Sequence, residues 1–171
     1  MRKYSLLILL SIIFSCNYKE ARTKNIQIGV EISDKGEQIS LNAGNMSTVS
    51  VWQKYIDAHN NRDIKTIKSM NADEFKVYGP RGEFIDGSEA HEEFLLAWFS
   101  GNNPKWSPKY FIANEVVDSE GNLMQWVTSC HDLTLFVDNV ELKVVQVHDA
   151  LIKGGKVQKF YVYERIKNEN E

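Results

Sequence analysis

The spacing of apolar positions changes part-way along the chain. From residue 47 to residue 101 they recur every three or four residues, whereas from about residue 109 to residue 164 they alternate with polar positions. The first spacing is typical of helices with one buried face, and the second of strands with one buried face. The pattern therefore predicts an α+β architecture, with helices first and an antiparallel meander afterwards, folded into a curved sheet around the helices.

Three helices are predicted in the first part. Ser47 or Thr48 can cap the first helix and Asp63 the second, because their side-chain oxygens accept hydrogen bonds from free amides of the first turn. The third helix starts at Ser88 and ends at Gly101. The apolar stripes consist of Val49, Trp52, Ile56 and His59 in the first helix, Ile64, Ile67 and Met70 in the second, and Ala90, Phe94, Leu95 and Trp98 in the third.

Strands account for most of the remaining sequence. A short strand at 74–78 and a Gly/Pro turn at 79–82 separate the second and third helices. Isoleucine and valine alternate between residues 26 and 32, which indicates a possible small hairpin before the first helix. The longer strand-like runs lie at about 109–118, 122–136, 141–153 and 156–164.

Two turns set the register of the last three strands. If Asp138-Asn139 and Gly154-Gly155 are two-residue hairpin turns, directly opposed residues share one face of the sheet. A single bulge would swap this assignment. One face then holds Trp126, Thr128, Cys130, Asp132, Val145, Val147, Asp149, Leu151, Phe160 and Val162, and the other holds Val127, Ser129, His131, Leu133, Val144, Gln146, His148, Ala150, Lys159, Tyr161 and Tyr163.

The first residues have the pattern of a secretion signal. Arg2 and Lys3 precede an apolar run at 6–14, which is far shorter than the roughly 20 residues that span a bilayer. Because the small Ser15 precedes Cys16, the segment resembles a bacterial lipoprotein signal, which implies cleavage after residue 15 and lipidation of Cys16. The alternative is an ordinary signal peptide with an incidental cysteine.

Composition narrows the range of partners. With Cys16 lipidated only Cys130 remains, so no disulfide forms within one chain. The formal net charge is −3 and no basic run is present, which argues against nucleic acid as a partner. The expected organisation is a signal peptide at 1–15, a tether and possible small hairpin at 16–45, one domain at 46–166 and a tail at 167–171.

Three segments carry a resemblance to a known superfamily. KYIDAHNNRDIKTIKSMNADEFKVYGPRG, the helix after Asp86-Gly87 and the closing GGKVQKFYVYER resemble the SnoaL-like branch of the nuclear transport factor 2-like (NTF2-like) superfamily. The resemblance covers roughly residues 47–166. It implies a cone-shaped fold in which three N-terminal helices pack on a strongly curved, mainly antiparallel sheet that encloses a pocket, often in dimers formed through the outer sheet face. A shared fold does not by itself carry a function across.

The steroid isomerases of this superfamily resemble the first half of the domain without a gap. Their tyrosine that donates to the enolate oxygen falls at Tyr55, and their general-base aspartate falls at Gly79. Their second, hydrogen-bond-donating aspartate falls at Val147. Since neither glycine nor valine can exchange a proton, steroid-isomerase chemistry is not expected. The same alignment implies that the face carrying Asp149 points inward.

Asp149 is the candidate functional carboxylate on that face. Burial among Val147, Leu151 and Phe160 would raise the pKa of its carboxyl toward the range that a general acid or base needs. The alternative is a structural carboxylate bonded to the backbone or to a basic partner near the sheet rim. The candidate ligand-binding residues, whose aromatic members favour an apolar or ring-containing ligand, are Tyr55, Trp98, Trp126, Thr128, Val147, Asp149 and Phe160.

No metal or cofactor is expected. His131 and His148 are each followed by an aspartate, but a strand sends neighbouring side chains to opposite faces, so we interpret them as surface or interface histidines. His59 and His91 lie on separate helices and add no ligand spacing. The sequence contains neither a Gly-rich phosphate loop before a helix nor a nucleophile elbow.

These observations leave three functional hypotheses. The leading one is a non-catalytic small-molecule-binding domain, held in the bacterial cell envelope through lipidated Cys16. The alternative is a cofactor-free lyase or isomerase with Asp149 as acid or base and Tyr55 as electrophilic donor. The third is an envelope interaction domain that uses the helices and no pocket. A homodimer is expected through an outer-face patch made of Val144, His148, Tyr161 and Tyr163.

Overall fold

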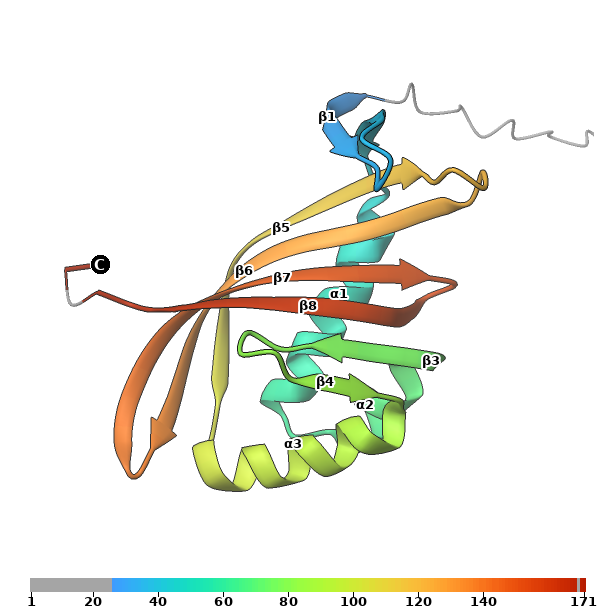
Figure 1. Ribbon diagram of the computed structural model, residues 1–171. Helices are drawn as coiled ribbons and strands as arrows, with labels where there is room; N and C mark the ends of the chain where they lie inside the picture. The colour runs from blue at the N-terminus through green and yellow to red at the C-terminus, as the bar shows by residue number, and fades with distance from the viewer. Residues whose placement is uncertain (1–25, 169) are drawn as a thin grey trace, which may run out of the picture.

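One curved sheet and three helices make up the described part of the chain. The computed structural model describes residues 26–168 and 170–171, so the predicted signal and Cys16 lie outside the described residues. The helices pack against one side of an eight-stranded sheet, as Figure 1 shows. None of these helices is both long and apolar enough to cross a bilayer. The α+β architecture predicted from the change in spacing is confirmed.

The three helices begin close to the predicted positions. Asn45 caps the first, because its Oδ1 accepts a hydrogen bond of 2.9 Å from the Ser47 amide, so the cap lies earlier than predicted. Asp63 caps the second by accepting from the Thr66 amide at 3.0 Å, as predicted. The third continues through Gly101, which was predicted to end it. The helices are α1 (Met46–Asn60), α2 (Ile64–Met70) and α3 (Ser88–Asn102).

The strands follow the order β1-β2-β5-β6-β7-β8-β3-β4 across the sheet. All neighbouring pairs are antiparallel except β3 and β8, whose parallel pairing brings the segment after α2 beside the C-terminal strand. The short β4 was not predicted. The strands are β1 (Gln27–Ile32), β2 (Gln38–Ala43), β3 (Asn71–Tyr78), β4 (Phe84–Asp86), β5 (Lys105–Val117), β6 (Leu123–Val137), β7 (Val140–Lys153) and β8 (Lys156–Ile166).

Both predicted two-residue hairpin turns are present. The four turn residues have positive φ, as such turns require. The register of β6 on β7 is the predicted one, with Trp126 opposite Leu151. The register of β7 on β8 begins as predicted, with Lys153 opposite Lys156, but it shifts between Leu151 and Ile152. Gln158 has no opposed partner at this point and forms a bulge.

The bulge makes the predicted facing of β6 and β7 wrong. Phe160 faces the helices as predicted, but the residue opposite it is Ala150, and Asp149 lies opposite Tyr161 on the outer face. The set predicted to face outward on β6 and β7 is therefore the inner one. This inner set is buried and consists of Val127, Ser129, His131, Leu133, Val144, Gln146, His148 and Ala150.

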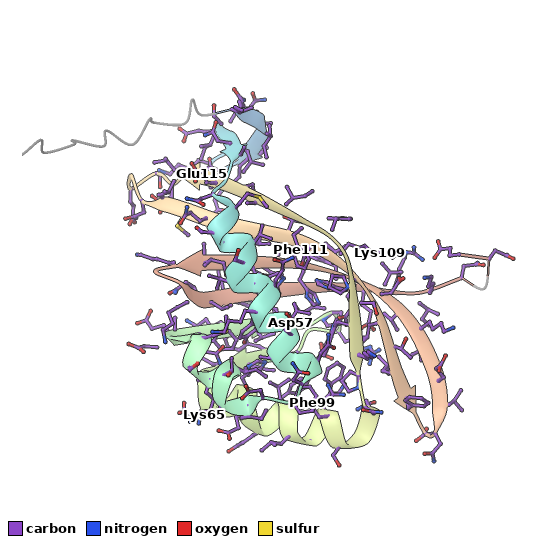
Figure 2. All side chains as sticks on the ribbon, turned by 180° about the vertical axis from the view of Figure 1, so that it is seen from behind. Asp57, Lys65, Phe99, Lys109, Phe111 and Glu115 are labelled. Carbon is purple, nitrogen blue, oxygen red and sulfur yellow. The ribbon has the colours of Figure 1, made fainter. Side chains whose placement is uncertain are left out.

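The core lies between α1 and the inner face of the sheet. Figure 2, the reverse view, shows α1 lying across the long strands. Trp52 and Tyr55, three residues apart on α1, share one helix face and are almost fully buried. Trp52 Nε1 donates a hydrogen bond of 2.8 Å to Ser129 Oγ on β6, so the buried indole is fully satisfied. This contact fixes α1 against the strands that form the functional site.

Candidate functional site

A cavity of about 180 Å³ lies between α1, α3 and the inner face of the sheet. Its lining includes the β3–β4 turn on one side and the end of the β6–β7 hairpin on another. A cavity of about 150 Å³ holds one benzene molecule, whereas drug-sized ligands need roughly 300 Å³ or more. The enclosed space therefore fits about one six-membered ring with a small substituent.

Aromatic rings form much of the wall. Trp52 stacks on Tyr55 with ring centroids 5.2 Å apart, and Phe160 lies 5.3 Å from Trp52. Trp98 on α3 and Trp106 at the start of β5 approach to 5.4 Å. All five residues line the cavity. Such walls favour a flat ring, because aromatic pairs add to the gain from burial alone.

Four buried histidines surround the cavity, and of these the sequence placed only His59 on a buried helix face. His59, His91 and His148 line it, and His131 lies behind His148 with ring centroids 4.8 Å apart. Their exposed fractions are all 5% or less. The interpretation of His131 and His148 as surface or interface histidines is wrong, because the bulge turns both side chains inward. Figure 2 labels Phe99, whose ring packs edge-on against His59.

Burial keeps these imidazoles uncharged at neutral pH. It lowers the pKa of His59 and of His131 to about 4, and that of His91 to about 3, because the protonated ring loses its hydration. The pKa of His148 falls well below its usual range for the same reason. No group of three or more His, Cys, Asp or Glu residues within 26–168 and 170–171 has the geometry of a metal site.

The protonation of His59 follows from its hydrogen bond. His59 Nδ1 lies 2.8 Å from the carbonyl oxygen of Tyr55, one turn earlier on α1. A carbonyl oxygen can only accept, so Nδ1 carries the proton and Nε2 carries a lone pair. Nε2 has no hydrogen-bond partner among the described residues, yet it is not one of their fully enclosed unpaired atoms. Because His59 lines the cavity and this atom is not fully enclosed, we infer that Nε2 faces the cavity.

A second network runs from the cavity wall to its rim. Gln146 Oε1 accepts hydrogen bonds from Trp106 Nε1 at 2.8 Å and from His148 Nε2 at 3.0 Å. Gln146 Nε2 donates to Glu164 at 2.8 Å, and Glu164 also accepts from Arg81 at 3.1 Å. Because an indole N–H only donates and a carboxylate only accepts, the amide orientation of Gln146 is fixed. His148 Nε2 must then donate.

The Tyr55 hydroxyl is engaged within the protein. It donates to Asn71 Oδ1 at 2.7 Å, and Asn71 Nδ2 donates in turn to Ser88 Oγ at 2.9 Å. Burial raises the pKa of Tyr55 well above its usual value, so the phenol keeps its proton. The same oxygen lies 3.5 Å from His91 Nδ1. Since its proton is shared with Asn71, Tyr55 offers His91 only a lone pair.

The comparisons with known proteins are structural. No protein-family model and no curated protein matches the chain. An NTF2-like protein from Burkholderia xenovorans matches with a TM-score of 0.56 at 13% identity, covering 72% of this chain and 92% of its own. The chain has the cone-shaped NTF2-like fold. The fold implied by the sequence resemblance is thereby confirmed.

Two further solved structures show how varied this fold is. A candidate SnoaL-like polyketide cyclase from Shewanella denitrificans matches with a TM-score of 0.58 at 10% identity, covering 71% of this chain and 92% of its own. An LEH-like epoxide hydrolase from M. tuberculosis matches with a TM-score of 0.55 at 12% identity, covering 68% and 80%. At such identities the NTF2-like fold is shared, and activity must be argued from the site.

The predicted site residues form two groups, according to whether they line the cavity or lie on the outer face of the sheet. Tyr55, Trp98 and Phe160 line the cavity, as predicted. The remaining four lie on the outer face of the sheet and do not line the cavity, so their predicted facing is wrong. They are Trp126, Thr128, Val147 and Asp149.

The four residues on the outer face make contacts with other outer-face side chains. Asp149 Oδ1 accepts a hydrogen bond of 2.6 Å from Thr128 Oγ1, across the strand pair. Trp126 stacks on Tyr161, and the Lys159 ammonium lies 5.5 Å from the Trp126 ring centroid. Asp149 is therefore bonded to a threonine hydroxyl, neither to the backbone nor to a basic partner, and it does not share a cavity with Tyr55.

The position of the isomerase base does lie at the cavity. Gly79 is part of the lining, and a Cβ added there would stand 2.5 Å from a Glu83 carboxylate oxygen. No carboxylate replaces it in the aromatic interior, since the lining carboxylates are Glu83 and Glu164, in the β3–β4 turn and near the end of β8. Two residues of the predicted dimer patch, Val144 and His148, are buried on the inner face, and that part of the prediction is wrong.

Proposed function

We propose that this domain binds a small, uncharged, ring-containing molecule in its cavity and acts as a binding module. The observation that carries the proposal is the wall itself. Six aromatic residues and three neutral histidines line a cavity of about 180 Å³, the space of one substituted ring. A charged group deep in this cavity would lose its hydration without gaining an opposite charge, which is costly. An uncharged ring is therefore favoured.

The general base predicted for the enzymatic alternative, Asp149, does not face the cavity. A general base has to lie within hydrogen-bond reach of the proton it abstracts. Asp149 faces away from the cavity and is bonded to Thr128. The predicted electrophile, the Tyr55 hydroxyl, already donates to Asn71. The contacts that a lyase or isomerase of the predicted type needs are therefore absent among the described residues, which favours binding without turnover.

Tryptophan fluorescence provides the test. Trp52, Trp98 and Trp106 line the cavity, so a bound ring should change their emission in a saturable way. The matched variant is Ile85→Phe, which adds bulk to a buried lining residue and should abolish the change while the protein stays folded. A Trp126→Phe variant should respond like the unchanged protein. Absence of any saturable response to a panel of small aromatic compounds at millimolar concentration would refute the proposal.

Envelope anchoring belongs to the same proposal. Its support is the basic start, the apolar run at 6–14 and the placement of Cys16 directly after a small residue. Three acyl chains on Cys16 would hold the protein firmly at a membrane, because each buried methylene contributes about 0.8 kcal/mol. Mass spectrometry of the N-terminus of protein from its own host tests this. Acylated Cys16 is expected, and an intact Met1 or an unmodified Cys16 would contradict it.

A further inference from the structure

Almost all hydrogen-bond donors deep in the cavity are already used by the protein. Apart from the N–H of His91, whose ring makes only the 3.5 Å contact with Tyr55 Oη, each of these polar N–H and O–H groups has a partner within the fold. The engaged donors are Trp52 Nε1 on Ser129, Tyr55 Oη on Asn71, His59 Nδ1 on the Tyr55 carbonyl, Trp106 Nε1 and His148 Nε2 on Gln146, and Gln146 Nε2 on Glu164.

The other unused donors lie on more exposed residues. Trp98 Nε1 has no partner among the described residues, but Trp98 is only half-buried. The Arg81 guanidinium belongs to an exposed residue of the β3–β4 turn, where it pairs with Glu164. The buried part of the cavity therefore differs from a site that stabilises an oxyanion, which needs free donors aimed at the developing charge.

Acceptors, in contrast, are left over. His59 Nε2 bears a lone pair that is open to the cavity, because Nδ1 donates to the Tyr55 carbonyl. His91 has the same tendency, since the Tyr55 oxygen 3.5 Å from its Nδ1 offers only a lone pair. The shorter contact of His59, 2.8 Å against 3.5 Å, makes its ring the better oriented of the two.

We propose that the cavity selects a neutral ring that carries its own hydrogen-bond donor, and that His59 Nε2 accepts this hydrogen bond. This inference rests on the proposed function and names the ligand class, of which phenol is the simplest member. A phenol places its ring against the aromatic wall and its O–H on the imidazole. No bond is made or broken in this recognition.

Three probes of nearly equal size separate this proposal from simple apolar binding. Phenol offers a donor, toluene offers neither donor nor acceptor, and pyridine at pH 7.5 offers only an acceptor. Apolar burial alone favours toluene, because an unpaired hydroxyl is costly to bury. With a hydrogen bond to His59, phenol should bind the full-length protein on the order of tenfold more tightly than toluene, with pyridine weakest.

His59→Phe is the test variant, because it keeps a ring of similar size and removes the lone pair. It should lose the preference for phenol over toluene while still binding toluene. His131→Phe is the matched control, the same substitution at a buried histidine that lies behind His148 and does not line the cavity, and it should keep the preference. Retention of the preference in His59→Phe, or its loss in His131→Phe, would overturn the assignment to His59.

A measurement on the unchanged protein covers the case in which His59→Phe does not fold. In ¹⁵N NMR of histidine-labelled protein, His59 should appear as the Nδ1–H tautomer, with an Nε2 resonance that shifts on adding phenol and stays in place on adding toluene. An Nε2–H tautomer for His59, or equal shifts with both probes, overturns the inference. If toluene binds as tightly as phenol, only this inference fails, whereas if no ring binds at all, the proposed function fails with it.

Discussion

The polar residues on the two faces of the sheet differ in burial and in charge. On the inner face His131, His148 and Gln146 are buried and uncharged. Each histidine makes one hydrogen bond through Nε2, and its buried Nδ1 has no partner among the described residues. On the outer face Asp132 is partly exposed and charged, and it pairs with Lys109 and Lys167 at 3.3 and 3.0 Å. Titratable groups stay neutral where water is excluded and stay charged where water reaches them. The inner face is therefore lined by neutral polar groups and the outer face by charged ones.

Acidification gives the largest expected difference between the two faces. The pKa of His59 and of His131 falls to about 4 on folding, and that of His91 to about 3, from an unfolded value near 6.5. The unfolded chain therefore binds more protons than the native one below pH 6.5, and stability falls as the pH falls from about 6.5 toward about 4. Each histidine can lower the free energy of unfolding by up to about 1.4 kcal/mol for each pH unit of acidification. The four together can therefore lower it by up to roughly 5 kcal/mol per pH unit.

Denaturant unfolding at a series of pH values checks this slope. His148→Gln should reduce it by about one histidine's share, on the order of 1.4 kcal/mol per unit, since glutamine does not titrate. Carboxylates whose pKa is lowered by basic partners, such as Asp132 beside Lys167, lose their contribution only at lower pH, as it falls through their native pKa. A free energy of unfolding that stays constant between pH 6.5 and pH 5 would contradict the prediction.

Two tryptophans that pack against opposite faces of the sheet, Trp52 from α1 and Trp126 from β6, give the next largest effect. Trp52 is 1% exposed, stacks on Tyr55 and donates to Ser129, so Trp52→Ala should cost about 3–5 kcal/mol of stability and leave the Ser129 hydroxyl short of a partner. Trp126 is half-buried on the outer face, and Trp126→Ala should cost about 1 kcal/mol. Equal losses in urea unfolding would mean that the two faces do not differ in packing.

The sequence predicted the helices and strands well but not the identity of the site residues. Spacing of 3.6 and of 2 residues, the Asp63 cap and the glycine and asparagine turns are local signals, and the structure has elements at all of them. The facing of β6 and β7 was inferred from the steroid-isomerase alignment and from an unbroken register, which in the structure shifts by one residue between β7 and β8. Gln158 is an ordinary polar residue in a strand of ordinary composition, so nothing local marked the bulge there.

The burial of the two strand histidines, His131 and His148, was missed for a related reason. A histidine in an alternating strand is compatible with either face, and the adjacent aspartate drew attention to the wrong one. The sequence did contain one signal for a histidine at the cavity. His59 belongs to the apolar stripe of the first helix and lies one turn after Tyr55, so if Tyr55 faces inward, His59 faces the same way. The tautomer of His59 was not predictable, since it depends on a side-chain contact with the Tyr55 carbonyl oxygen.

Dimer formation through the outer face stays a prediction, with a corrected set of residues. Tyr110, Ile112 and Tyr163 are 45–57% exposed on this face, which is a large apolar and aromatic area to leave in water. Tyr163→Glu should weaken the dimer about 30-fold, the effect of losing an interface aromatic worth roughly 2 kcal/mol. Val30→Glu, on the edge strand β1, is the control and should leave it unchanged. Sedimentation of the unchanged protein as a monomer at micromolar concentration would remove the prediction.

The smallest expected effect belongs to the residue that the sequence favoured most. Asp149 accepts one hydrogen bond from Thr128 on the outer face, and Asp149→Asn keeps an oxygen in the same place. Stability should therefore change by less than about 1 kcal/mol. Affinity for phenol should stay within about twofold, since the cavity lies on the other side of the strand and the substituted group neither touches the ligand nor orients His59. Measured by the same fluorescence titration, a tenfold loss in Asp149→Asn together with an unchanged His59→Phe would place the site on the outer face and reverse the assignment of the two faces.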